Sequence, residues 1–218
     1  MSSTQLSAQE SASRSSFIPC FLRGFFENPL QVASFVPSSG YLQRKLSSLA
    51  CLQSARCVVE LGPGTGETTQ TLLDAIPAAT QLLCVEVVSE FVNHLQEFAD
   101  PRLTVVEDSA LYLEEILRRN QLQAPDVIVS GVPFSVMTPE EGRQLIETIH
   151  RVLAPGGAFV TYQFRNSVCE LAEDCFGAPQ SRAFVLWNLP PLEIYLWEKT
   201  AETDSLEASH VLVPPALK

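Results

Sequence analysis

The sequence predicts an α/β fold with a mostly parallel sheet, helices on both faces and an antiparallel last strand. Short β-rich runs alternate with helical segments from residue 57 onward, which is typical of parallel strands joined by crossover helices. The last two β-rich runs, 182–187 and 192–198, are joined by a segment too short for a crossover helix, so they should pair antiparallel. A chain of 218 residues is also close to the usual size of one domain.

A helical extension is expected ahead of the sheet. Residues 1–16 are rich in serine and lack an apolar run, which predicts a disordered tail. Residues 17–56 predict a helical segment, because apolar side chains repeat at every fourth position from Phe17 to Phe25 and a second short helix should follow Gly40. The apolar face of that second helix consists of Leu42, Leu46 and Leu49.

The strands and helices of the expected domain, residues 57–200, follow in order. The strands are predicted at 57–61, 81–87, 103–107, 126–130 and 158–164, with 103–107 and 126–130 buried. The intervening helices are predicted at 67–75, 89–98, 110–119 and 139–153. Ser89 should cap the second of these helices and Thr138 the fourth, where a proline and two acidic residues follow. Residues 201–218 are expected to form a C-terminal tail.

Composition and charge exclude several classes of protein. The chain is 46% hydrophobic, but its apolar runs are far shorter than the ~20 residues of a membrane span. A net charge of -11 argues against broad binding to nucleic acid, so DNA is not expected as a partner. The six cysteines form no C-x-x-C pair, which indicates thiols in a reducing cytoplasm without a disulfide framework or a metal site.

Three glycines at alternate positions separate the first strand of the sheet from the following helix. The loop reads Gly62, Pro63, Gly64, Thr65 and Gly66. Glycine is required where the backbone turns sharply and a ligand approaches closely. A dinucleotide fingerprint would have its third glycine one place later, where Glu67 stands and would repel a pyrophosphate. A dinucleotide cofactor is therefore disfavoured.

An acidic residue stands at or near the carboxyl end of each of three successive strands. Glu60 lies in the first strand, Glu86 ends the second and Asp108 follows the third. Ligands of open α/β sheets bind at these carboxyl ends, where Glu86 could accept hydrogen bonds from both ribose hydroxyls and Asp108 could read an adenine amino group. The alternative is that the glycines form only a tight turn and the acids are solvated helix caps.

The combination resembles the class I methyltransferases that use S-adenosyl-L-methionine, over residues 57–200. The resemblance implies a Rossmann-like, seven-stranded sheet with an antiparallel last strand. It also implies that Glu60 and the glycines surround the methionine part, Glu86 holds the ribose and Asp108 meets the adenine. This cofactor carries a sulfonium, an ammonium and a carboxylate but no phosphate, which suits an acidic site. The expected cofactor site comprises Glu60, Gly62, Pro63, Gly64, Thr65, Gly66, Glu86, Val87, Asp108, Ser109 and Ser130.

The fourth strand ends in the sequence SGVPF, from Ser130 to Phe134. It resembles the N-L-P-F or N-P-P-Y segment of methyltransferases that act on amines, although Ser130 replaces the usual acid or amide. The resemblance implies a nitrogen acceptor, backbone carbonyls of Gly131 and Pro133 that receive the amine hydrogens, and a Phe134 ring that covers the acceptor. The alternative is that Phe134 is tucked into the core.

Two flanking regions narrow the choice of amine. The flanking segments are residues 21–29 and 34–41 on one side and 187–191 on the other. Taken with the glycine loop and SGVPF, they look like the bacterial phospholipid N-methyltransferases, which methylate phosphatidylethanolamine, and their ornithine-lipid-methylating relatives. The resemblance spans about residues 20–198. It implies an aminolipid substrate, an N-terminal amphipathic helix that contacts anionic membrane at the inner face, and a Tyr41 that lies over the cofactor.

Charge is distributed in agreement with a membrane contact. Residues 1–56 hold five basic and two acidic side chains, a net +3, which leaves -14 for the remainder. Phe21, Arg23 and Phe25 lie in the apolar stripe, and Arg44 lies on the polar side of the second helix. Apolar burial beside basic residues is typical of an interfacial helix. Only Arg23 lies within the stripe, so a helix that packs over the domain as a lid is the alternative.

The chemistry requires an amine that has lost its proton, because an ammonium has no lone pair. Tyr41, with Tyr195 as the second candidate, is predicted to orient the amine and pass its proton to water, although Tyr195 could instead be a core residue. The rival functions are an RNA adenine methyltransferase, a small-molecule amine methyltransferase and a binding protein without turnover. RNA is disfavoured by the acidic charge of the catalytic part.

Overall fold

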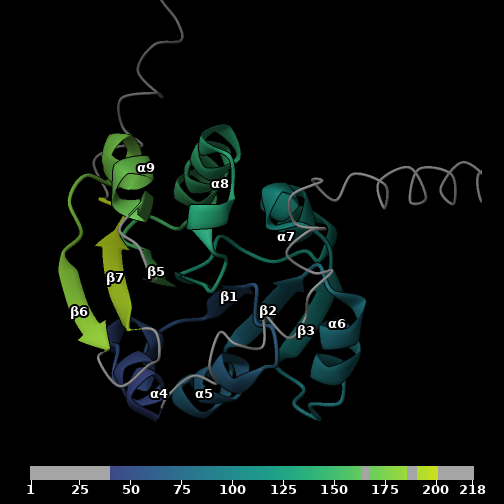
Figure 1. Cartoon of the computed structure of the whole chain (residues 1–218). Helices are drawn as coiled ribbons and strands as arrows, with labels where there is room; N and C mark the ends of the chain where they lie inside the picture. Colours follow the sequence, from purple (N-terminus) through teal and green to yellow (C-terminus); the bar gives the residue numbers. More distant parts are fainter. Residues whose placement is uncertain (1–39, 164–166, 186–190, 201–218) are drawn as a thin grey trace, which may run out of the picture.

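The protein forms a seven-stranded sheet with helices on both sides, seen in a computed structural model that describes residues 40–163, 167–185 and 191–200 (Figure 1). The strand order is β3-β2-β1-β4-β5-β7-β6. The strands are β1 (Cys57–Leu61), β2 (Gln81–Glu86), β3 (Leu103–Glu107), β4 (Val127–Ser130), β5 (Ala158–Gln163), β6 (Ser181–Val185) and β7 (Leu192–Glu198).

The strand order reverses beside β1, and this creates the place where a ligand can bind. The chain winds outward from β1 to β2 and β3, then crosses back to β4 on the other side of β1. All these pairs are parallel, so β1, β2 and β4 end at the same edge, where Leu61 lies between Val85 and Ser130 in register. Loops that leave this edge in opposite directions open a crevice at the switch point.

Among the residues that the structure describes, three helices cover each face of the sheet. Figure 1 shows α4 (Gly40–Ser47), α5 (Glu67–Ala75) and α6 (Ser89–Gln96) on one side and α7 (Leu113–Arg119), α8 (Pro139–Val152) and α9 (Ser167–Phe176) on the other. Each side has its own apolar cluster, because successive strand residues point to opposite faces. Short 3-10 turns are η1 (Ala50–Leu52), η2 (Ala110–Tyr112) and η3 (Phe134–Val136). Within the described residues, no helix has the length and apolar character that crossing a membrane requires.

Most of the predicted elements are confirmed, and the antiparallel ending is among them. β7 pairs antiparallel with both β5 and β6. The helix predicted after Gly40 is α4, whose Leu42 and Leu46 are buried in the cluster beneath α5. Thr138 caps α8 through a capping box with Glu141. The helix predicted from Phe17 and the tails lie outside the described residues.

Two local predictions are wrong. Ser89 does not cap α6, because Val88 holds the cap position and the Ser89 hydroxyl donates to Glu107 Oε1 at 2.5 Å. The strand 103–107 is not buried, because β3 lies at the edge of the sheet and leaves Thr104 and Glu107 exposed. In addition, α9 was not predicted from the sequence. This helix lies between β5 and β6 in the chain and packs on one face of the sheet.

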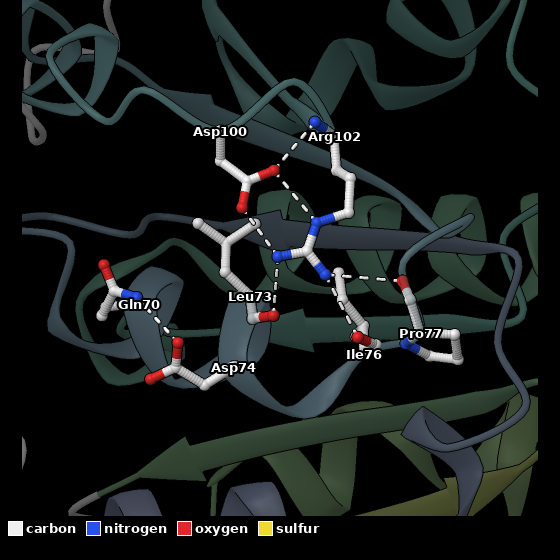
Figure 2. Close-up of polar contacts among 7 residues, drawn as sticks. All are labelled: Gln70, Leu73, Asp74, Ile76, Pro77, Asp100 and Arg102. Atoms are coloured by element: carbon white, nitrogen blue, oxygen red, sulfur yellow. Dashed lines mark hydrogen bonds and ion pairs between the residues drawn. The ribbon is translucent and has the colours of Figure 1, made fainter.

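Arg102 binds the carboxyl end of α5, the helix that starts at the glycine loop (Figure 2). Its guanidinium donates to the carbonyl oxygens of Leu73 at 2.9 Å and Ile76 at 3.1 Å, where the last turn of α5 leaves acceptors without helical partners. Asp100 binds the same guanidinium through both carboxylate oxygens. These hydrogen bonds lower the pKa of Asp100 to about 2.

Candidate functional site

The glycine loop connects β1 to α5 at the switch point. Its first N–H, from Gly62, donates to the Val85 carbonyl at 2.9 Å and so extends the β1–β2 ladder by one residue. Gly66 caps α5 with a φ of 84°. A side chain there would place its Cβ 2.8 Å from a methyl carbon of Leu95 and 2.9 Å from the Phe98 ring, so α6 packs directly on the loop. Only glycine satisfies both the conformation and the contact.

Glu86 joins the glycine loop to the loop after β2. Its Oε2 accepts from the Gly64 N–H at 3.0 Å, and its Oε1 accepts from the Val87 and Val88 N–H groups at 2.7 and 3.0 Å. The side chain is buried, and burial raises its pKa, while the three backbone donors act in the opposite direction. A carboxylate is thus held at the position predicted for the ribose, beside the backbone of both loops.

Glu60 lies beneath the glycine loop with one oxygen satisfied and one not. Its Oε2 accepts from Thr69 Oγ1 at 2.6 Å and from Cys84 Sγ at 3.3 Å. Its Oε1 is buried and has no hydrogen-bond partner among the described residues. Burial, together with the nearby Glu86 charge, raises the pKa of Glu60 to about 7. A buried carboxylate oxygen without a donor is costly unless a cationic or donor group of a ligand meets it.

Asp108, the third predicted acid, follows β3 at the same edge. Its backbone N–H donates to the Glu86 carbonyl at 3.0 Å, which places it beside the end of β2. Its carboxylate accepts from the Ser109 N–H at 2.8 Å and pairs with Arg119 of α7 at 2.6 Å. This Arg119 partner was not predicted from the sequence, where it stands eleven positions after Asp108.

The loop after β4 lies against the glycine loop. The Gly131 N–H donates to the Leu61 carbonyl at 2.8 Å, and the Ser130 hydroxyl accepts from the Val132 N–H at 3.3 Å. Gln163, at the end of β5, donates to the Val132 carbonyl at 2.9 Å and thereby fixes the path of the loop. Pro133 is half-buried. The Phe134 side chain is 2% exposed and belongs to the apolar cluster, which is the alternative that the sequence left open for it.

Tyr162, which was not among the predicted site residues, lies at the same end of the sheet. It lies one residue before the end of β5, next to the loop after β4. Its hydroxyl would be 2.4 Å from a Cβ on Gly131 and lies 3.4 Å from Thr68 Oγ1 in the first turn of α5. The sequence feature that could have identified Tyr162 is its position at the end of the strand expected to follow β4 in the chain.

The two tyrosines predicted as catalytic are placed differently from each other. Tyr195 is fully buried on the α8–α9 face, and its hydroxyl donates to Glu193, which Arg182 also binds at 2.6 Å. Tyr162 points to the opposite face, since Tyr195 is in register with Thr161, the neighbour of Tyr162.

Tyr41 is half-buried in the first turn of α4. Arg44 is exposed near its ring, while Phe21, Arg23 and Phe25 lie outside the described residues.

The residues present fit S-adenosylmethionine. The Glu60 Oε1 atom offers an acceptor for its ammonium, and the bare backbone of the glycine loop permits close approach. Glu86 and Asp108 stand at the ends of the next two strands in order. The acidic edge suits a ligand with a sulfonium and an ammonium but without phosphate.

Comparisons with known proteins show the family to which the chain belongs. A family model described as a methyltransferase domain matches residues 58–157. The chain is 35% identical over 185 residues to the ornithine lipid N-methyltransferase of Singulisphaera acidiphila. The matched region covers 84% of this chain and 96% of that protein. The chain is also 35% identical over 143 residues to the ribosomal RNA small subunit methyltransferase A of Phenylobacterium zucineum, but that match spans 62% of this chain and only 46% of the relative.

Solved structures with the same fold include the N-methyltransferase NodS from Bradyrhizobium japonicum WM9. The TM-score is 0.59 at 14% identity, over 75% of this chain and 99% of that one. The same enzyme is known in complex with S-adenosyl-L-homocysteine, with a TM-score of 0.56. The strand order, the acidic edge and the near full-length relative agree, and the chain belongs to the class I S-adenosylmethionine-dependent methyltransferases.

Proposed function

We propose that the protein methylates the amine of an aminolipid head group, with an ornithine lipid or phosphatidylethanolamine as the acceptor. The observation that carries the proposal is the relationship to ornithine lipid N-methyltransferase, which extends over 84% of this chain and 96% of that protein. The matches to ribosomal RNA methyltransferases cover less than half of each relative.

Charge supports a lipid rather than an RNA acceptor. The net charge of the chain is -11, and residues 1–56 carry +3 of it. The residues after 56 therefore carry a net charge of -14. An RNA substrate would require a basic face, because phosphate contacts supply most of its affinity. The basic charge instead accompanies the Phe21, Arg23 and Phe25 stripe. We propose that this stripe and Arg44 make a peripheral contact with anionic membrane on the cytoplasmic side.

The acceptor amine would lie at the loop after β4. S-adenosylmethionine supplies a methyl group made electrophilic by its sulfonium. The backbone carbonyls of Gly131 and Pro133 accept the amine N–H groups and aim the nitrogen lone pair, while Gln163 keeps the loop in position. Tyr41, on the α4 side, helps to orient the amine and to pass its proton to water. Tyr195 is a buried core residue on the opposite face of the sheet, so it has no part in the proposed reaction.

Expression in a bacterium that lacks methylated aminolipids tests the proposal. Mass spectrometry of the lipid extract should show an ornithine lipid or phosphatidylethanolamine heavier by one, two or three methyl groups. A Glu86→Ala variant expressed to the same level serves as the control and should give far less product. An unchanged lipid extract from cells whose purified wild-type protein binds S-adenosylmethionine would contradict the aminolipid assignment and leave the family assignment intact.

A further inference from the structure

The strand order determines which end of the cofactor meets which residues. Asp108 follows β3 and Glu86 ends β2, so the adenine and ribose are assigned to that side of the edge. The next strands in order are β1, β4 and β5. The methionine part therefore extends over the loops that follow β1 and β4, where Gly62 and Gly131 stand.

That end of the site has an excess of negative charge. Glu60 lies below the loop with an oxygen that has no hydrogen-bond partner among the described residues, and Glu86 is near enough to raise its pKa. The methionine part carries both an ammonium and a carboxylate. Glu60 suits the ammonium, but both acids repel the carboxylate. The carboxylate therefore needs a hydrogen-bond donor that carries no negative charge.

Two hydroxyl groups meet at this end of the site. The Tyr162 hydroxyl lies 2.4 Å from the position that a Gly131 Cβ would take, and the Gly62 carbonyl oxygen lies 2.8 Å from that same position. The Tyr162 hydroxyl therefore lies where the loop after β1 meets the loop after β4. The Thr68 hydroxyl, from the first turn of α5, is 3.4 Å away, at the outer limit for a hydrogen bond between them.

The phenol keeps its proton and so remains a donor. Burial raises the pKa of Tyr162, and the negative charge of Glu60 raises it further. A phenolate would also be repelled by the carboxylate of the ligand, whereas a phenol donates to it.

We propose that Tyr162, together with Thr68, binds the carboxylate of the methionine part of S-adenosylmethionine through its hydroxyl. The inference rests on the family and its cofactor and is independent of the acceptor. Gly131 belongs to the same arrangement, because a side chain there would occupy the place of the Tyr162 hydroxyl.

Calorimetry with two ligands tests the proposal on the full chain. S-adenosylmethionine has the carboxylate, whereas decarboxylated S-adenosylmethionine lacks it and keeps the sulfonium and ammonium. Tyr162→Phe should raise the Kd of S-adenosylmethionine about tenfold, or about 1.4 kcal/mol, and leave that of the decarboxylated ligand within about twofold. Tyr112→Phe, which removes a hydroxyl from a residue that is 40% exposed, is the matched control and should change neither.

A second variant makes the test independent of the behaviour of the first. Thr68→Val keeps the shape of a buried side chain and should likewise weaken S-adenosylmethionine more than the decarboxylated ligand. If both variants preserve the wild-type ratio of the two affinities, the proposal is wrong. This outcome includes an equal loss of affinity for both ligands, which would show that the hydroxyls support the pocket without contacting the carboxylate.

Discussion

The carboxylate of Glu86 accepts a hydrogen bond from the Gly64 N–H at 3.0 Å, so the acid at the end of β2 also holds the glycine loop after β1. The same side chain accepts from Val87 and Val88. One residue therefore determines the relative position of the two loops between which the ribose is expected.

Replacement of Glu86 should weaken cofactor binding. We expect Glu86→Ala to cost about 1.5 kcal/mol or more of S-adenosylmethionine affinity by calorimetry, because a hydrogen bond to a charged group contributes ~1.5–3 kcal/mol. Glu86→Gln keeps an acceptor for the backbone and should lose less. Glu90→Ala, an exposed acid on α6, is the control and should bind normally. An unchanged Kd for Glu86→Ala would remove Glu86 from the cofactor site.

Cofactor binding should depend on the protonation of Glu60. Its pKa of about 7 means that the carboxyl group is largely neutral at pH 5.5 and gains its charge as the pH rises. S-adenosylmethionine affinity should therefore increase by about tenfold between pH 5.5 and 7, below the range where an α-amino group itself loses its proton at ~7.7–8. Glu60→Gln should bind weakly with a flat pH profile. Parallel profiles for the two proteins would contradict the assignment.

Glu60 should also make the stability of the protein without ligand fall as the pH rises, whereas cofactor affinity rises. A carboxyl whose pKa is raised by folding favours the folded state at low pH, and this contribution is lost as the pH rises from the unfolded pKa toward 7. In thermal unfolding without ligand, Glu60→Gln should therefore be more stable than wild type at pH 8 and gain little at pH 5. A gain that is the same at both pH values would argue against the buried charge.

Gly131 should not tolerate a side chain, even the smallest. A Cβ there would lie 2.4 Å from the Tyr162 hydroxyl and 2.8 Å from the Gly62 carbonyl, so Gly131→Ala must displace the two loops. We expect a loss of about 1–3 kcal/mol in the free energy of unfolding and weaker cofactor binding. Gly156→Ala meets open space at a φ of 75° and should lose ~1 kcal/mol from conformation alone, with normal binding. Equal binding by both variants would contradict the close approach.

Arg102 should contribute to stability through the end of α5. We expect Arg102→Ala to lower the free energy of unfolding in urea by about 2 kcal/mol, because carbonyls of the last turn lose a charged donor. Arg151→Ala breaks an exposed pair with Glu114, and exposed pairs typically contribute only ~0–1 kcal/mol. Similar losses for the two variants would show that the helix end does not depend on Arg102.

The proposed membrane contact can be tested on the N-terminal stripe, which lies outside the described residues. The double change Phe21→Asp and Phe25→Asp should reduce sedimentation with anionic vesicles, because it removes apolar burial next to Arg23. Phe184→Asp changes a 54% exposed phenylalanine on β6 and is the matched control. Equal sedimentation of the stripe variant and wild type would favour a lid.

Several features could be predicted from short stretches of sequence. The alternation of strands and helices, the glycine loop and the three acids after successive strands depend on local spacing, which the chain carries in any context. The capping box at Thr138 was predictable for the same reason. The carboxyl ends of parallel strands must share one edge, so Glu60, Glu86 and Asp108 could be brought together without a structure.

Tertiary structure decided which of the two strand tyrosines, Tyr162 or Tyr195, lies beside the loop after β4. Tyr162 and Tyr195 lie on neighbouring antiparallel strands, and their register is offset by one residue, which sends their side chains to opposite faces of the sheet. The same long-range packing buries Phe134, pairs Asp108 with Arg119 and leaves Glu60 Oε1 without a hydrogen-bond partner among the described residues. Strand register and helix packing depend on contacts between distant residues, and local spacing carries no information about them.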